Sequence, residues 1–188
     1  ARENSSVEAR DNSSVVAWGN SSVVACGNVQ VVNRLDRGRV EISGNARIVF
    51  MPKNIEEFMS FYNIKHDKKK AIFFKAVHHS EEGYVSDHDS DIKYPIGELV
   101  RESCDPDTRD DCSYGIHIAH RSWCLDFGRQ WEDLAIIEVE TDIDKIILPN
   151  GTNGKVRTSE VKVLREIPLE ECGVYRKILA KRIKEENK

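Results

Sequence analysis

Residues 1–32 decide the fold of the first part of the chain, and they read ARENSSVE, ARDNSSVV, AWGNSSVV and ACGNVQVV. The four octads align without a gap, with Ala, Asn and Val each recurring at a fixed position. A period this short and regular is typical of stacked rungs of β-structure. The sequence therefore predicts an elongated β-solenoid over residues 1–50. The recurring residues are Ala1, Ala9, Ala17 and Ala25; Asn4, Asn12, Asn20 and Asn28; and Val7, Val15, Val23 and Val31.

Each octad divides into a short strand and a turn. Ala and Val are expected to point inward from the strand, while an Asn-Ser or Gly-Asn pair turns the chain. Eight residues are too few to surround a packed core, so we expect two octads per coil. The pattern slips by one residue before Val40, and Val40 and Ile48 resume the period. The segment after Pro52 is expected to cap the last coil, whose backbone would otherwise stay unpaired.

Residues 51–188 lack the octad repeat and contain mixed helix and strand signals, which predict a compact α+β domain with an antiparallel or mixed sheet. Asn54 with Glu57 three residues later is typical of a helix start and predicts a capping helix over 54–62. A second helix is expected near 122–128. Apolar and alternating segments predict a sheet core over 70–167, and a C-terminal helix is expected over 169–186. The strand segments include AIFFKAV (71–77), LAIIEVET (134–141) and KVRTSEVKVLREI (155–167).

Composition excludes several classes of protein. The formal net charge of −4 argues against non-specific nucleic-acid binding. The longest apolar runs are too short to span a bilayer, so no membrane partner is expected. Five cysteines, an odd number, favour a reducing cytoplasm over secretion. A Cys104–Cys112 bridge is the alternative in an oxidising compartment.

The densest group of reactive side chains lies in CDPDTRDDCSYGIHIAHRSWC (104–124), which holds five of the eleven Cys and His residues. Cys104, Cys112, His117, His120 and Cys124 are side chains of the kind that bind zinc. Their spacing matches no zinc module, and ordinary packing and hydrogen bonding is the favoured interpretation. The Asp-rich part lacks the Gly and the distal Glu of an EF-hand loop. We therefore predict no metal site.

Aromatic and imidazole groups gather in the same region. Tyr114, His117, His120 and Trp123 are expected to lie near one pocket. Such groups suit a nucleotide or its base. The sequence therefore predicts a ligand-binding site here.

The order of three segments, FFKAV, YGIHIAHRSWCLDFG and SEVKVLREI, resembles the motif order of ADP-ribosyltransferase folds. The resemblance implies an enzyme that acts on NAD or a nucleotide, with NAD as the cofactor. A residue of the first strand would hold the nicotinamide-ribose end, an aromatic or imidazole ring would stack on the base, and a Glu would orient the acceptor. The residues so implied are Lys75 or His78, then His117 or Tyr114, then Glu160 or Glu138.

The whole chain resembles uncharacterised proteins of bacterial phages and prophages. The likeness rests on the NSSVxA octads, the SGNARIV junction and the GIHI motif of the second domain. It implies a phage-type protein in the cytoplasm of a bacterial host.

Three functions follow as alternatives. The first is a binding protein in which the repeat extends or oligomerises and the second domain captures a nucleotide or a protein. The second is the ADP-ribosyltransferase-like enzyme, and the third is a structural component of the virion or its assembly. Exposed edge strands of the repeat also predict a homo-oligomer.

Overall fold

The computed structural model describes residues 1–188 except 3, 36–38, 51, 82, 151 and 173–188. The chain divides into two compact units, Ala1–Lys53 and Asn54–Lys188. We call them the octad unit and the half-barrel unit and describe each by itself.

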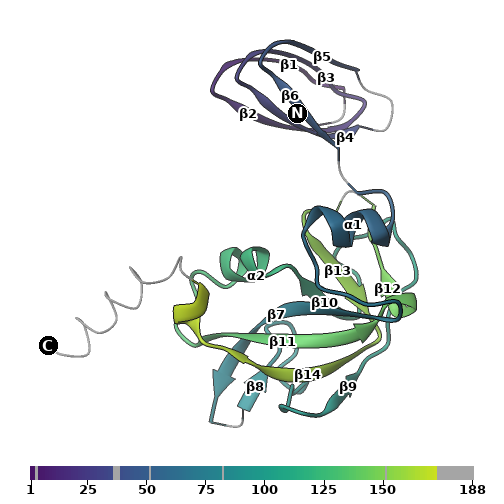
Figure 1. The fold of residues 1–188 in the computed structure, drawn as a ribbon, viewed down its shortest axis with the longest axis vertical. Coiled ribbons are helices and arrows are strands. Elements are labelled where there is room, and N and C mark those ends of the chain that lie inside the picture. The colour runs from purple at the N-terminus through teal and green to yellow at the C-terminus, as the bar shows by residue number, and fades with distance from the viewer. Residues whose placement is uncertain (3, 36–38, 51, 82, 151, 173–188) are drawn as a thin grey trace, which may run out of the picture. The chain divides into compact units, whose positions relative to one another are not determined.

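The octad unit is made of two three-stranded parallel sheets (Figure 1). Paired residues of β1 and β3 lie two octads apart in the sequence, as Ser6 and Ser22 do, and those of β3 and β5 lie one residue further apart, as Ser22 and Arg39 do. Strands alternate between the sheets along the chain. One sheet contains β1 (Ser6–Asp11), β3 (Ser22–Gly27) and β5 (Arg39–Gly44), and the other β2 (Ser14–Gly19), β4 (Gln30–Leu35) and β6 (Arg47–Phe50).

Small residues fill the space between these sheets, and asparagines link the turns. Asn28 Nδ2 donates to Asn12 Oδ1 at 3.1 Å, and Asn45 Nδ2 donates to Asn28 Oδ1 at 3.2 Å. Gly27 has φ +94°, and a Cβ there would lie 3.1 Å from the backbone nitrogen of Asp11. The turn therefore favours glycine both for its positive φ angle and for the close approach of the neighbouring strand. The buried residues are Ala9, Ala17, Val23, Ala25, Val29 and Val31.

The half-barrel unit is built on an eight-stranded antiparallel sheet. The strand order is β12-β13-β10-β7-β11-β14-β9, with β8 paired to β7. The elements are α1 (Ile55–Phe61), β7 (Lys70–Ser80), β8 (Gly83–Val85), β9 (Leu99–Arg101), β10 (Ile116–Ala119), α2 (Arg121–Phe127), β11 (Leu134–Asp142), the 3-10 turn η1 (Ile143–Lys145), β12 (Ile146–Ile147), β13 (Lys155–Thr158), β14 (Glu160–Ile167) and the 3-10 turn η2 (Leu169–Cys172).

The sheet curls because two strands far apart in its order follow one another in the chain. Only Ser159 separates β13 from β14, although three strands lie between them in the sheet. Hydrogen bonds hold this bend: Thr141 Oγ1 lies 3.0 Å from Thr158 Oγ1 and donates to the carbonyl of Glu160 at 2.8 Å. The bend thus brings the two ends of the order toward each other, and the result is a half-barrel.

Each face of the curled sheet carries its own core. One core contains Phe73, Ile137 and Val163 from the strands and Phe58 and Met59 from α1. Asn54 caps α1, since its Oδ1 accepts the N–H of Glu57 at 2.9 Å. The other core joins Cys124 and Leu125 of α2 to residues such as Ile136 and Ile167. The two helices therefore pack on different cores and fix the loops around β10.

The fold class expected from the sequence is wrong. The chain is mostly β, with a curled antiparallel half-barrel, and its described residues contain only two α-helices, each seven residues long. Such short helices cannot form the helical layer of an α+β domain, and the sheet instead encloses a core by curling. The expected solenoid is not found either: the octad unit consists of two three-stranded parallel sheets. Of the helix expected over 169–186, Leu169–Cys172 forms η2 and the remainder lies outside the described residues.

Candidate functional site

A group of three nitrogen-bearing side chains lies on neighbouring strands of the half-barrel. His117 on β10 pairs with Arg157 on β13, and Ala119 pairs with Lys155. Directly opposite side chains of an antiparallel pair share a face, and alternate residues of one strand do too. His117, Lys155 and Arg157 therefore face the same side. We call these three residues the cationic cluster.

Arg157 anchors the segment 104–114 to the sheet. The side chain is fully buried. Nε donates to the carbonyl of Asp105 at 3.0 Å, Nη1 to that of Asp110 at 2.5 Å, and Nη2 to that of Asp107. Since a guanidinium has five N–H donors, these bonds engage most of the donors of Arg157. The role of Arg157 is therefore to hold the loop that borders the cluster.

Lys155 is a buried cation, 9 % exposed. Nζ donates to Cys112 Sγ at 3.2 Å and lies 6.0 Å from the centroid of the Trp123 ring. No carboxylate of the described residues forms an ion pair with it. Burial of an unpaired charge is costly in free energy, and an anion bound next to this ammonium group would reduce that cost.

His117 brings an unused polar atom to the same cluster. Among the buried side-chain nitrogens and oxygens of the described residues, only its Nε2 lacks a hydrogen-bond partner. Burial lowers the pKa of His117 to about 4, and the charges of Lys155, Lys75 and Arg157 act in the same direction. The imidazole is therefore neutral at pH 7.

His120 and Trp123 form the edge of the cluster at the start of α2. His120 caps the helix, since its Nδ1 accepts the N–H of Trp123 at 3.3 Å, and its ring stacks on Tyr62 at 4.4 Å. Burial lowers the pKa of His120. Trp123 Nε1 donates to Asn153 Oδ1 at 3.0 Å. These contacts make His120 a structural residue, whereas Trp123 also borders Lys155.

Tyr114, the fourth residue expected near one pocket, lies at the surface. Its side chain is 62 % exposed. Its backbone carbonyl accepts the N–H of Asp105 at 3.1 Å, within the segment that Arg157 holds. Tyr114 therefore borders the cluster through the loop rather than through its ring.

The two residues expected on the first strand, Lys75 and His78, have different surroundings. Lys75 is 9 % exposed; Nζ donates to the carbonyl of His117 at 3.2 Å and lies 5.1 Å from the Tyr94 ring centroid. Burial lowers the pKa of Lys75 to about 8. The ladder between β7 and β10 consists of the pair Ala119 with Phe74. Lys75 thus supplies a donor to β10 beside that short ladder.

His78 lies further along β7, between two carboxylates. Its Nδ1 is 2.8 Å from Asp133 Oδ1 and its Nε2 is 3.1 Å from Asp87 Oδ1, while the ring stacks on Trp131 at 4.2 Å. Burial acts against protonation, but the hydrogen bonds to Asp133 and Asp87 outweigh it and raise the pKa of His78. The contacts account for both ring nitrogens, so His78 serves to join three segments.

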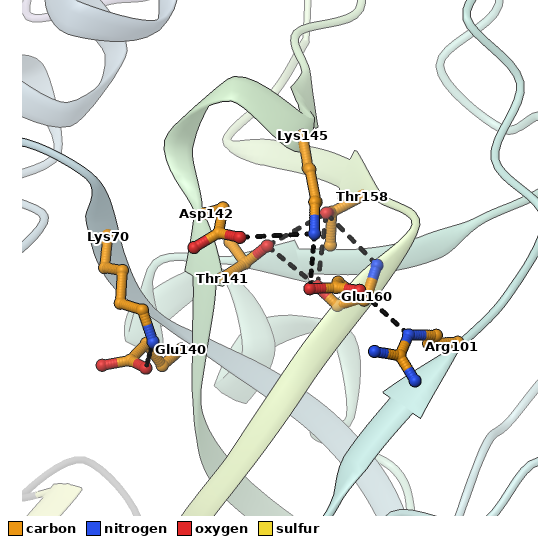
Figure 2. Close-up of polar contacts among 8 residues, drawn as sticks. All are labelled: Lys70, Arg101, Glu140, Thr141, Asp142, Lys145, Thr158 and Glu160. Carbon is orange, nitrogen blue, oxygen red and sulfur yellow. Dashed lines mark hydrogen bonds and ion pairs between the residues drawn. The ribbon is translucent and has the colours of Figure 1, made fainter.

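Both candidate glutamates are held in ion pairs. Glu160 accepts from Lys145 Nζ at 2.6 Å and from Arg101 Nε at 3.1 Å (Figure 2). The bond to Lys145 is the main reason why the pKa of Glu160 lies below its usual value. Glu138 accepts from Arg165 Nε at 2.9 Å. Among the described residues, none of these side-chain partners comes from β10, and no hydrogen bond or ion pair joins either carboxylate to His117.

Cys26 lies in the octad unit, and the other four cysteines lie in the half-barrel unit. All five are free thiols; Cys112 is exposed, Cys104 is half-buried and Cys124 is buried. Burial raises the pKa of Cys124 to about 12, which makes it an inert thiol at neutral pH. The described part of the chain contains no group of three or more His, Cys, Asp or Glu side chains arranged to hold a metal ion.

Sequence reasoning missed Lys155 and Arg157. The signal is present in KVRTS, where the apolar Val156 separates two basic residues in a strand segment. Such alternation normally places the polar residues in water. Here all four residues of β13 are buried, because the 104–114 segment covers the face that would otherwise be solvated.

Comparison with known proteins identifies no relative from which a role could be transferred. No protein-family model, no curated protein and no solved structure matches the chain. None of the helices in the described residues has the length and apolar character needed to cross a membrane. The function must therefore be inferred from the cluster and its surroundings.

Proposed function

We propose that this is a phage-type binding protein in which the half-barrel unit captures a nucleotide at the cationic cluster. The octad unit serves extension or self-association, and the protein acts in the cytoplasm of a bacterial host. The observation that carries the proposal is Lys155, a buried lysine beside the indole ring of Trp123 for which the described part of the chain supplies no carboxylate partner.

The chemistry of the cluster favours an anion attached to a flat ring. An anionic ligand would supply the counter-charge that Lys155 lacks, and this contact offsets the cost of burying the cation. Trp123 is adjacent and half-buried; its ring stacks on Phe127 at 4.9 Å, and the part of the indole that stays exposed would contact a base. A nucleotide combines both groups in one small molecule.

A thermal-shift assay against a panel of nucleotides tests this function. A ligand present at 100 times its dissociation constant should stabilise the protein by about 2.7 kcal/mol. Lys155→Met should abolish the shift, whereas Lys162→Met, an exposed lysine on β14, should retain it. If no nucleotide shifts the transition of the wild type, the function is refuted.

The enzyme alternative is separable from binding by one further measurement. It requires a Glu that is free to orient an acceptor, yet Glu160 and Glu138 are both engaged by basic side chains. We therefore place binding first. If the wild type turns over labelled NAD and the Glu160→Gln variant does not, the function is catalysis rather than ligand capture.

Self-association is a second part of the proposal. Strands at the ends of the parallel sheets carry backbone groups that can pair with another copy of this chain. Light scattering is expected to give a mass that is a multiple of 21.5 kDa. A monomer at all concentrations would refute an oligomeric role for the octad unit.

A further inference from the structure

We infer that Lys155 and His117 form a phosphate subsite, in which a phosphate monoester of the captured ligand contacts Lys155 Nζ and His117 Nε2. This inference rests on the proposed function and names the part of the ligand that the cluster recognises. The same chemistry would accept free inorganic phosphate, and the experiment below distinguishes the two sources.

The carboxylates near the cluster interact with groups other than Lys155. The carboxylate of Asp107 is bonded to Arg109, and that of Asp105 accepts from Ser113. Both also act electrostatically with Arg157. Asp111 is the acid that acts on His117. Among the described residues, Cys112 Sγ is the hydrogen-bond acceptor of Lys155 Nζ, and no carboxylate forms an ion pair with this ammonium group.

The remaining donors are suited to phosphate rather than to a carboxylate. A carboxylate is best recognised by the planar guanidinium of an arginine. The guanidinium of Arg157 already donates hydrogen bonds to three backbone carbonyls. A lysine is a point charge with three N–H groups, a common way to bind phosphate. Since one of these groups contacts Cys112, two remain for phosphate oxygens.

His117 supplies the second point of contact. Its imidazole is on the same face as Lys155, one diagonal position away across the β10–β13 ladder. Nε2 has no partner among the described residues. In the tautomer that carries the proton on Nε2, this atom can donate to a phosphate oxygen, which would satisfy an otherwise unpaired buried group.

The loop at Cys112 provides the approach to the subsite. Cys112 is exposed, and its sulfur accepts a hydrogen bond from Lys155 Nζ, so a ligand that reaches Cys112 from solvent lies next to Lys155. The surrounding segment is fixed by Arg157 and by a hydrogen bond from the Asn150 N–H to the Thr108 carbonyl at 2.7 Å. A phosphate can therefore reach the two remaining N–H groups of Lys155 with a change at the Cys112 side chain rather than a movement of the loop.

Calorimetric titration of the full chain with AMP, adenosine and inorganic phosphate tests the subsite. AMP should bind at least about tenfold more tightly than adenosine, because bonds from charged donors to the phosphate are lost with the nucleoside. Inorganic phosphate should compete with AMP. Lys155→Met should bind AMP and adenosine alike, while Lys162→Met should keep the wild-type preference.

The outcomes separate the subsite from the wider function. Equal binding of AMP and adenosine by the wild type would overturn the subsite and leave nucleotide capture intact, whereas binding of neither would overturn both. Lys155→Met should also melt no lower than the wild type without ligand, since it removes an unpaired buried charge. If that variant fails to fold, His117→Asn gives the same test: unchanged preference for AMP would overturn the inference.

Discussion

Replacing Arg157 with Met should release the segment 104–114 and destabilise the half-barrel unit. The guanidinium is fully buried and bonds three backbone carbonyls. A hydrogen bond from a charged donor contributes about 1.5–3 kcal/mol, which gives an upper limit of roughly 5–9 kcal/mol for three. Removing a buried charge and letting the carbonyls rehydrate offset part of this loss. We therefore expect a net loss of about 3 kcal/mol, or a melting temperature lower by about 6–12 °C.

Urea unfolding, followed by hydrogen exchange, measures both parts of this expectation. The free energy of unfolding should fall with little change in the m-value, and amide protection should fall most in residues 104–114. Arg165→Met is the matched control on β14, because Arg165 is half-exposed and pairs with Glu138 near the surface. It should cost no more than about 1 kcal/mol. An Arg157→Met variant within 1 kcal/mol of the wild type, or one with unchanged protection of this segment, would refute the anchoring role.

The remaining predictions concern three structural contacts. Since the folded protein holds the pKa of His78 above its ordinary value of 6.5, stabilisation by Asp87 and Asp133 is fully present below pH 6.5 and is lost as pH rises through the folded pKa. His78→Gln should flatten this pH dependence of the melting temperature; an unchanged profile would contradict it. Thr141→Val removes two bonds at the β13–β14 bend and should cost about 1–2 kcal/mol in urea unfolding. Asn54→Ala removes the cap of α1 and should cost about 1 kcal/mol, whereas Asn54→Ser should be close to neutral.

Local sequence signals predicted the elements of the fold better than their arrangement. Asn54 begins α1 because its side chain satisfies a free N–H of the first turn, and that rule acts within four residues. The octads likewise placed the short strands. The fold class failed because curling depends on long-range pairing, in which β13 and β14 take distant places in one sheet despite being separated by Ser159 alone. The sequence showed KVRTSEVKVLREI as one alternating strand, with no glycine or proline to mark the bend.

The candidate site was only partly visible for a similar reason. His117 stood out as an imidazole between two isoleucines, and its place on a strand followed from that pattern. Lys155 became relevant only through Cys112, forty-three residues away in the chain, and through Trp123. Burial of a lysine depends on what covers it, and the covering segment carries no hydrophobic pattern that would predict its position. Contacts of this kind cannot be derived from composition or spacing.

The two-octad spacing of the parallel pairs has a consequence for how such a protein can vary in length. Inserting one octad before β3 would move every later strand from one sheet to the other, whereas inserting two would leave each strand in its own sheet. Each permitted step would add one strand to both sheets, about 4.8 Å along the stacking direction. Length variants that keep the join to the half-barrel unit should therefore differ by even numbers of octads, so repeat number obeys a parity rule.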